Sequence, residues 1–218
     1  HFRNDLYAVR CRVGIKLGDL FFCIMAVGGG HFREFIGRES VALRIDKMKM
    51  EEFDFVDYIL CTHAHFDHAD PDTLNKLARI NSKAKFIAPE PIKDVIMSYG
   101  ISEERMIGAF ADKVIDLDGC KIVPIPAAHE ELRTDEKGNY YDMGYQILFD
   151  DIVIYHGGDC CIYDGIKERL LNTDILMVPV NGRSYYKRYV EDIIGNMTCE
   201  EAVILAKETN ADMIIPMH

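Results

Sequence analysis

The stretch YILCTHAHFDHAD, residues 58–70, sets the expectation for the whole chain. An apolar run over residues 55–60 predicts a buried strand, and it ends in a group of polar side chains between His63 and His68. Protonated imidazoles this close together would repel one another, and buried neutral ones would forfeit hydrogen bonds. A divalent metal removes both costs, because zinc, manganese and iron(II) bind neutral imidazole and ionised carboxylate.

The spacing of these residues predicts two ions in one site. Alternate side chains of an extended segment share a face, so His63 and His65 can bind one ion. A turn into a helix would then bring Asp67 and His68 to a second position beside the first. The alternative is a solvated histidine-rich turn, which the specific HxHxDH spacing at the end of a strand disfavours.

These residues resemble the Thr-His-x-His-x-Asp-His hallmark of the metallo-β-lactamase superfamily, which follows a buried strand. The resemblance continues in order along the chain. A later strand leads into PIPAAHE with His129, an apolar strand ends in a Gly-Asp pair at Asp159, and the strand MIIPMH ends in His218. All positions of the pattern are filled over residues 53–218. Taken singly, His129 and His218 could each be an ordinary core histidine. Their positions match those of the superfamily pattern, which disfavours that interpretation.

The resemblance implies an α/β (α+β) fold, a four-layer αββα sandwich of two mixed β-sheets flanked by helices, with the site along one sheet edge. It implies two divalent metal ions, manganese or zinc, with Asp159 as the bridge between them. The implied ligands of the first metal are His63, His65 and His129, and those of the second are Asp67, His68 and His218. The implied catalytic residues are Asp67, Asp159 and His218.

Composition bounds the class of protein. The 218 residues suffice for one large domain or two small ones, and a hydrophobic content of 49% can build a sizeable core. The formal charge of −11 counts against a nucleic-acid binder. Seven cysteines without a CxxC pair indicate reduced thiols in the cytoplasm. No apolar run has the length of a membrane span, no signal peptide opens the chain, and both termini are expected to be incomplete.

Strands alternate with helices along the chain, which predicts one layered α/β domain over residues 1–218. The expected strands are 13–17, 20–27, 55–60, 84–88, 113–117, 121–126, 144–149, 152–155, 174–180 and a final one from residue 213. The expected helices are 70–80, 91–99, 164–171 and one capped by Thr198 and Glu201 that runs to about residue 208. Residues 130–142 and 181–197 are expected to be long loops, the first of them over the active site.

Several residues near the motifs have a structural and a functional interpretation. Thr62 and Asp70 are expected to orient the histidines or cap a helix, and His156 to pack behind Asp159. Cys160 and Cys161 could bind zinc as thiolates, although the ligand set is complete without them. Glu130 accepts a proton or is simply solvated. The turn at 28–30, His31 and Arg33 are interpreted as a flexible turn and surface residues.

The resemblance narrows at residues 59–65, 102–105, 178–183 and 194–198 to the L-ascorbate-6-phosphate lactonase-like branch. It implies a cytoplasmic homo-oligomer that opens a phosphorylated sugar lactone through a metal-bound hydroxide. In the loop after residue 180, Asn181, Arg183, Lys187 and Arg188 would bind the anionic substrate, although scattered charge on a solvated loop explains them nearly as well. The alternatives are a phosphodiesterase or nuclease with the same site, and a metal-binding sensor without turnover.

Overall fold

The computed structural model describes residues 54–190 and 192–217, together with the backbone of three strands within the first 25 residues. Two compact units make up the chain. Unit 1 comprises His1–Ala88 and Lys93–Ile107, and unit 2 comprises Pro89–Ile92 and Gly108–His218. Each unit is described by itself. The single domain over residues 1–218 stays a prediction, and the turn at 28–30, His31 and Arg33 lie outside the described residues.

Among the described residues, unit 1 is built on a sheet of strand order β1-β2-β3-β4-β5-β6. The strands β1 to β3 form an antiparallel meander. Strand β4 pairs in parallel with both β3 and β5, so the sheet is mixed. The bounds of the strands are Leu6–Val9, Arg12–Leu17, Leu20–Met25, Tyr58–Cys61, Lys85–Pro89 and Met106–Ala109.

Strand β4 and the helix after it carry the first candidate motif. Ile59, Leu60 and Cys61 are fully buried, as expected for a central strand between parallel neighbours. The crossover to β5 runs through α1, Pro71–Ile80. Asp70 caps this helix by accepting a hydrogen bond from the Thr73 backbone, as the sequence predicted. The histidine-rich segment 62–70 therefore lies between the carboxyl end of a buried strand and a well-capped helix.

Two short helical segments follow β5, the first in residues of unit 2 and the second in unit 1. The expected helix over 91–99 is in fact a 3₁₀ turn, η3 at Glu90–Ile92, followed by α2 at Lys93–Met97. A further 3₁₀ turn, η4 at Glu103–Arg105, leads into β6. Arg105 donates to the backbone carbonyls of Ala84, Ala78 and Asn81 at 2.8, 2.9 and 2.6 Å, respectively. One guanidinium thereby ties the end of α1 to the start of β5.

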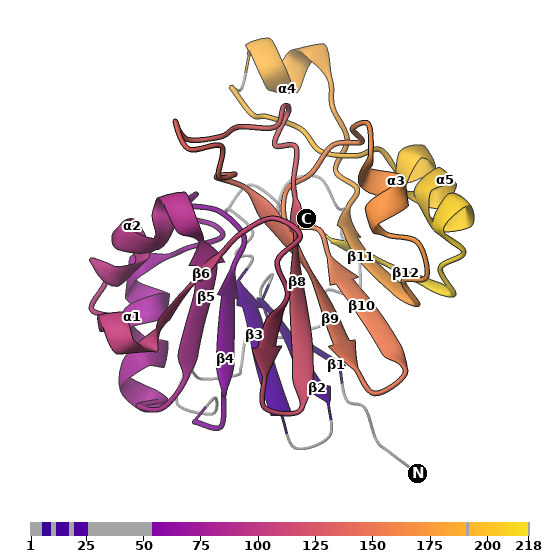
Figure 1. Cartoon of the computed structure of the whole chain (residues 1–218). Helices are drawn as coiled ribbons and strands as arrows, with labels where there is room; N and C mark the ends of the chain where they lie inside the picture. The colour runs from indigo at the N-terminus through magenta and orange to yellow at the C-terminus, as the bar shows by residue number, and fades with distance from the viewer. Residues whose placement is uncertain (1–5, 10–11, 18–19, 26–53, 191, 218) are drawn as a thin grey trace, which may run out of the picture. The chain divides into compact units, whose positions relative to one another are not determined.

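Unit 2 is built on a second mixed sheet, of order β12-β11-β10-β9-β8-β7 among the described residues (Figure 1). Strands β7 to β10 pair antiparallel, and β10, β11 and β12 pair in parallel. The bounds of the strands are Ile115–Leu117, Cys120–Pro126, Met143–Phe149, Ile152–His156, Ile175–Pro179 and Met213–Met217. The predicted hairpin across residues 150–151 is confirmed.

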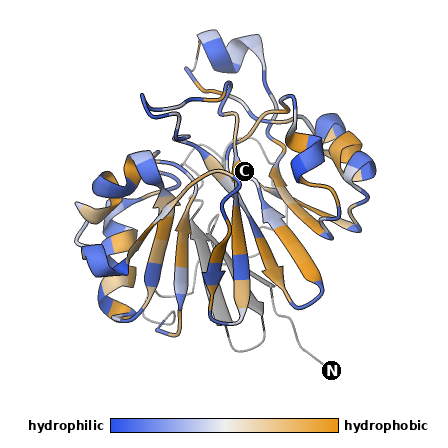
Figure 2. Ribbon diagram, viewed as in Figure 1, coloured by the Kyte–Doolittle hydropathy of each residue, from blue (hydrophilic) through white to orange (hydrophobic). Residues whose placement is uncertain are grey.

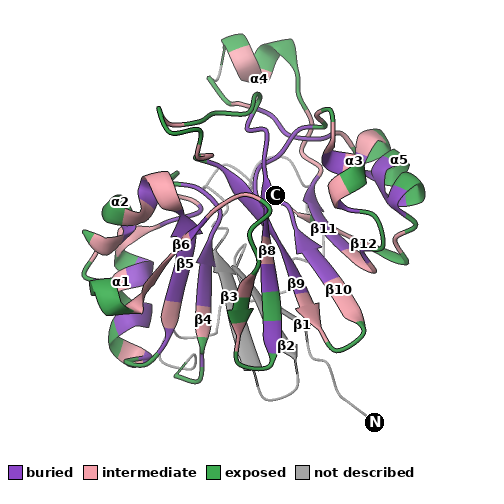
Figure 3. Ribbon diagram, in the orientation of Figure 1, coloured by how far each residue is buried: buried purple, intermediate pink, exposed green. Residues whose placement is uncertain are grey.

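Helices α3, Ile166–Arg169, and α5, Cys199–Thr209, cover the β10–β12 side of this sheet (Figure 1). The predicted capping box is confirmed, because the Thr198 and Glu201 side chains each bind the other residue's backbone. The apolar residues of β9 to β11 give this sheet its hydrophobic interior (Figure 2), and they are mostly buried (Figure 3). The core cluster joins strand residues such as Tyr155 and Val178 to Leu205 of α5.

The structure also differs from the sequence prediction in several elements. Strands β1 and β6 and the turn η4 were not expected, and β4 begins at Tyr58 because Phe55 lies half-exposed in a turn. The expected loop over 181–197 contains α4, Tyr185–Tyr189, capped by Ser184. This helix is mostly exposed (Figure 3), so no buried apolar face marks it in the sequence. No helix of the described residues is long and apolar enough to cross a membrane.

The Tyr155 hydroxyl is fully buried and has no hydrogen-bond partner among the described residues. It points at Gly144, where a Cβ atom would lie 2.6 Å from the oxygen. Because an unsatisfied buried hydroxyl destabilises the folded state, Tyr155→Phe should leave the free energy of unfolding unchanged or raise it by up to about 1 kcal/mol. The control is Tyr163→Phe, which removes a 2.6 Å hydrogen bond to the Pro126 carbonyl and should cost about 1 kcal/mol. Urea unfolding of both variants checks this, and a clear loss of stability in Tyr155→Phe would contradict it.

Candidate metal centre

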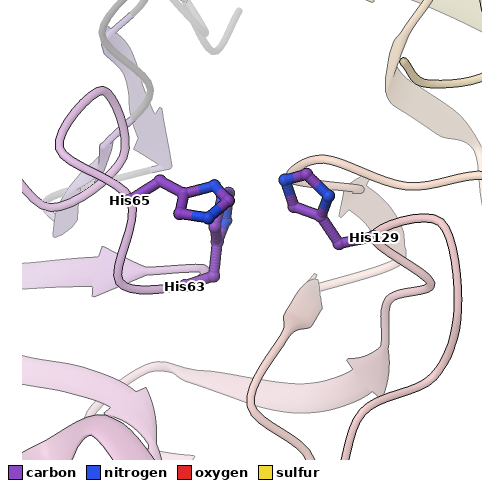
Figure 4. Close-up of side chains that lie close together, drawn as sticks. All are labelled: His63, His65 and His129. Carbon is purple, nitrogen blue, oxygen red and sulfur yellow. The ribbon is translucent and has the colours of Figure 1, made fainter. Parts of the chain in front are cut away.

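The residues after β4 form a tight turn that gathers three imidazoles in unit 1. The His65 carbonyl accepts hydrogen bonds from the backbone N–H groups of His68 and Ala69, at 2.9 and 2.7 Å. This turn folds the HxHxDH stretch back on itself before α1 begins. His63 and His65 project from it side by side (Figure 4).

Nitrogen atoms of these rings face one another. His63 Nε2 lies 3.1 Å from His65 Nδ1, and Thr62 Oγ1 lies 3.1 Å from His63 Nδ1. The His63 and His68 ring centroids are 4.1 Å apart, and both residues are almost fully buried. His65 is exposed, and a carboxylate oxygen of the half-exposed Asp67 lies 3.5 Å from His68 Nε2. The Thr62 hydroxyl thus lies within hydrogen-bond distance of a histidine ring, as its expected role in orienting the histidines requires.

Unit 2 contains a pair of candidate ligands of its own. His129 follows β8, and Asp159 follows β10. Figure 4 shows the ring of His129. His129 Nε2 lies 3.4 Å from Asp159 Oδ2, and both side chains are less than 10% exposed. The two segments are paired, because the Cys161 backbone N–H donates to the Ala128 carbonyl at 2.8 Å. His156 is fully buried, and its Nδ1 accepts a hydrogen bond from the Gly158 backbone.

The donor atoms suit a divalent cation. Two ligand atoms that bind one zinc ion tetrahedrally at about 2.0–2.1 Å lie roughly 3.3 Å from each other. The His63–His65 separation of 3.1 Å and the His129–Asp159 separation of 3.4 Å are both near that value. The His63 and His68 ring centroids are 4.1 Å apart, so protonation of both rings would place two like charges at about that distance. Such a pair of buried like charges is unfavourable. Neutral imidazole and carboxylate in these pairs therefore fit zinc or manganese.

The two cysteines beside Asp159 are buried thiols. Burial raises the pKa of Cys160 to about 12, so its metal-binding thiolate form is disfavoured. Its Sγ donates to the Cys161 carbonyl at 3.1 Å, and the Cys161 Sγ donates to the Gly195 carbonyl at 3.4 Å. Both side chains are engaged with backbone oxygens that lie outside the His129–Asp159 pair.

The predicted substrate-binding residues lie around α4 in unit 2, and acidic or carbonyl partners hold the charged ones. Arg183 pairs with Glu201 and donates to the Asn196 carbonyl at 3.1 Å. Lys187 Nζ donates to the Asn181 carbonyl at 2.5 Å. Burial alone would raise the pKa of Glu201, but hydrogen bonds from Arg183 and the Thr198 backbone lower it overall.

Arg188 forms an ion pair at 3.1 Å with Glu130, the neighbour of His129. Glu130 is exposed, and its φ of 70° places it in the left-handed region, where a non-glycine residue is uncommon. Glu130 therefore has a charged partner, which the sequence alone did not indicate. His218, the last predicted ligand, lies outside the described residues.

Two mixed sheets whose strands end in histidine and aspartate groups, with helices beside them, define the metallo-β-lactamase fold. The family model described as "Beta-lactamase superfamily domain" matches residues 35–218, so the chain belongs to this superfamily. Among solved structures, Igni18, a metallo hydrolase from Ignicoccus hospitalis, aligns with a TM-score of 0.66 and 21% identity over 98% of this chain and 81% of its own. The metallo-β-lactamase fold protein YhfI from Bacillus subtilis aligns with a TM-score of 0.66 and 15% identity over 96% and 78%. The predicted fold class is confirmed.

The chain is also similar to proteins named UPF0173 metal-dependent hydrolases. The protein of this name from Pyrococcus horikoshii is 32% identical over 185 residues, which are 77% of this chain and 68% of that protein. The one from Saccharolobus solfataricus is 29% identical over 143 residues, or 64% of this chain. The matched segments span 60% of the Saccharolobus protein and 65% of a relative from Methanoculleus marisnigri.

Proposed function

We propose that this chain is a metal-dependent hydrolase whose ligands come from the turn after β4 and from the His129–Asp159 pair. The observation that carries the proposal is the turn itself, where His63 and His65 nitrogens lie 3.1 Å apart beside the buried His68. The names of the UPF0173 relatives support it. In a solvated histidine-rich turn the imidazoles would be exposed to water, because burial of these polar rings costs free energy. His63 and His68 are instead buried.

The proposed ligands follow the order of the superfamily pattern along the chain, with two ions bound. His63, His65 and His129 would hold the first, and Asp67, His68 and His218 the second. Asp159 would lie between them, where a carboxylate offsets the repulsion of two cations. Such ions polarise the oxygen of a substrate carbonyl or phosphoryl group and lower the pKa of a water towards neutrality.

The chain's own groups would orient this chemistry. If His63 binds through Nε2, its Nδ1–H donates to Thr62 Oγ1, which fixes the tautomer and the plane of the ring. The buried His129–Asp159 pair keeps a carboxylate in surroundings where water competes weakly for it. We propose Asp67, Asp159 and His218 as the residues that contact the reacting atoms.

Removal and return of the metal tests this function. The purified chain, stripped with a chelator, should lose hydrolysis of a panel of lactones, esters and phosphodiesters, and added manganese or zinc should restore it. Retention of hydrolysis after complete stripping would contradict the proposal. Metal binding without hydrolysis of any member of the panel would favour a sensor.

The substrate proposed more specifically is a phosphorylated sugar lactone, handled by a cytoplasmic homo-oligomer. The support is the NGR motif at residues 181–183 and the cationic Lys187 and Arg188 of α4. Arg183 is partly exposed although Glu201 pairs with it, so a phosphate could share its guanidinium.

Arg183→Ala should raise the KM for a phosphorylated lactone at least about tenfold, since a charged hydrogen bond contributes about 1.5–3 kcal/mol. The KM for the same lactone without phosphate should change little. Steady-state kinetics with both substrates measures the difference. Equal changes in both KM values would remove Arg183 from phosphate recognition.

A further inference from the structure

Next to His129 in unit 2 lies an ion pair with a buried acidic partner. Arg133 Nε and Nη2 donate to the two carboxylate oxygens of Asp142 at 2.9 and 2.7 Å. The Asp142 side chain is 1% exposed, whereas that of Arg133 is 45% exposed. Because a buried carboxylate needs a charged or hydrogen-bonding partner, this two-point contact fixes the conformation of both residues.

The same two residues close the segment that leaves the sheet after β8 and returns at β9. The Tyr141 backbone N–H donates to the Arg133 carbonyl at 3.0 Å, and the Ala127 backbone N–H donates to the Asp142 carbonyl at 3.0 Å. Asp142 therefore uses its side chain to hold one end of the segment and its backbone to hold the residue two positions before His129.

The other edge of this stretch is bound to the Asp159 segment. The Ala128 carbonyl accepts from the Cys161 backbone N–H at 2.8 Å, and Tyr163 Oη donates to the Pro126 carbonyl at 2.6 Å. Residues 126–128 thus lie between Asp142 on one side and residues 161–163 on the other. Immediately beyond His129, Glu130 turns the chain away with a φ of 70°.

We propose that the Arg133–Asp142 pair is a positioning device that sets the separation of His129 and Asp159, and through it the affinity for metal. This inference rests on the proposed function, because it takes both residues as ligands. Neither Arg133 nor Asp142 contacts the metal. Loss of the two-point contact frees the return of the segment at Asp142, and with it the hydrogen bond that holds Ala127. His129 then no longer has a fixed distance to the Asp159 carboxylate, which is 3.4 Å in the intact pair.

Unit 2 offers a matched control in a second two-point contact, between Arg169 and Asp112. Arg169 donates to the two carboxylate oxygens of Asp112 at 3.1 and 2.9 Å. The side chains of Arg169 and Asp112 are both partly exposed. Neither residue is next to a candidate ligand in the sequence. The control shows whether loss of any two-point arginine–aspartate contact in unit 2 weakens metal binding. Because Asp142 is buried and Asp112 is not, Arg133→Met is also expected to lose more stability, and the change in ligand geometry distinguishes the positioning effect from that loss.

The test compares zinc affinity in Arg133→Met and Arg169→Met of the full chain, by competition with a chromophoric chelator. We expect Arg133→Met to bind zinc about 10- to 100-fold more weakly than the parent, the usual effect of losing a residue that orients a ligand. Arg169→Met should stay within about twofold of the parent. The absorption spectrum of the cobalt-substituted protein should change in Arg133→Met alone, because the ligand geometry changes there.

If Arg133→Met does not fold, the same comparison is made with Arg133→Lys and Arg169→Lys. Lysine keeps the charge that Asp142 needs but cannot form the two-point contact, so Arg133→Lys should still bind zinc more weakly than Arg169→Lys. Equal affinities in either matched pair overturn the positioning role. A parent protein that binds no zinc or manganese overturns the proposed function instead, so the two failures are distinguishable.

Discussion

Asp159→Asn is expected to abolish hydrolysis while the chain stays folded. Asparagine has the size of aspartate but lacks the charge that would hold two cations together. Asp159 lies in a buried part of unit 2 and is only 6% exposed, so water competes weakly for the position of the lost carboxylate. Metal affinity should fall by more than the roughly 10- to 100-fold typical of a residue outside the coordination sphere.

Asp116→Asn is the matched control for this variant. Asp116 is exposed on β7 and lies 3.6 Å from Lys121 Nζ, a surface pair that contributes little. Metal titration and steady-state kinetics should leave Asp116→Asn at the parent level, with both variants showing the parent's circular dichroism. An Asp159→Asn protein with the parent's metal affinity would exclude Asp159 from the ligand set.

Arg105→Ala is expected to lower the free energy of unfolding by about 2–4 kcal/mol. Its guanidinium donates to three backbone carbonyls, those of Ala84, Ala78 and Asn81. These carbonyls end α1 and precede β5, and alanine would leave them without their charged donor. The guanidinium also lies 5.2 Å from the Phe86 ring centroid, a contact that adds a cation–π contribution.

Arg79→Ala provides the comparison, at an arginine of α1 itself. Arg79 is exposed in the last turn of α1, so its removal should change stability by less than about 0.5 kcal/mol. Chemical denaturation of both variants measures the difference. Arg105→Ala with a stability equal to that of Arg79→Ala would show that the three carbonyls are satisfied equally well by water.

The sequence predicted the parts of the fold that local rules determine. Strand β4, the Asp70 cap of α1 and the Thr198–Glu201 capping box follow from apolar runs and from side chains that bind nearby backbone. The pattern of His63, His65 and His68 placed three imidazoles at the end of β4, where the structure has them.

The remaining features depend on contacts between residues far apart in the chain. Helix α4 was missed because its side chains are exposed and give no amphipathic pattern. The partners of Arg183 and Arg188 lie 18 and 58 positions away, and no spacing rule points to Glu201 or Glu130. Arg105 resembled a family motif in the sequence, but its role at the end of α1 depends on a tertiary contact.

The metal content of the purified chain tests the central claim most directly. Elemental analysis after loading with manganese or zinc and removal of free ions should give two ions per chain, and Asp159→Asn should retain fewer. A chain that retains no metal, or the same amount in the parent and in a variant lacking both His63 and His129, would contradict the account.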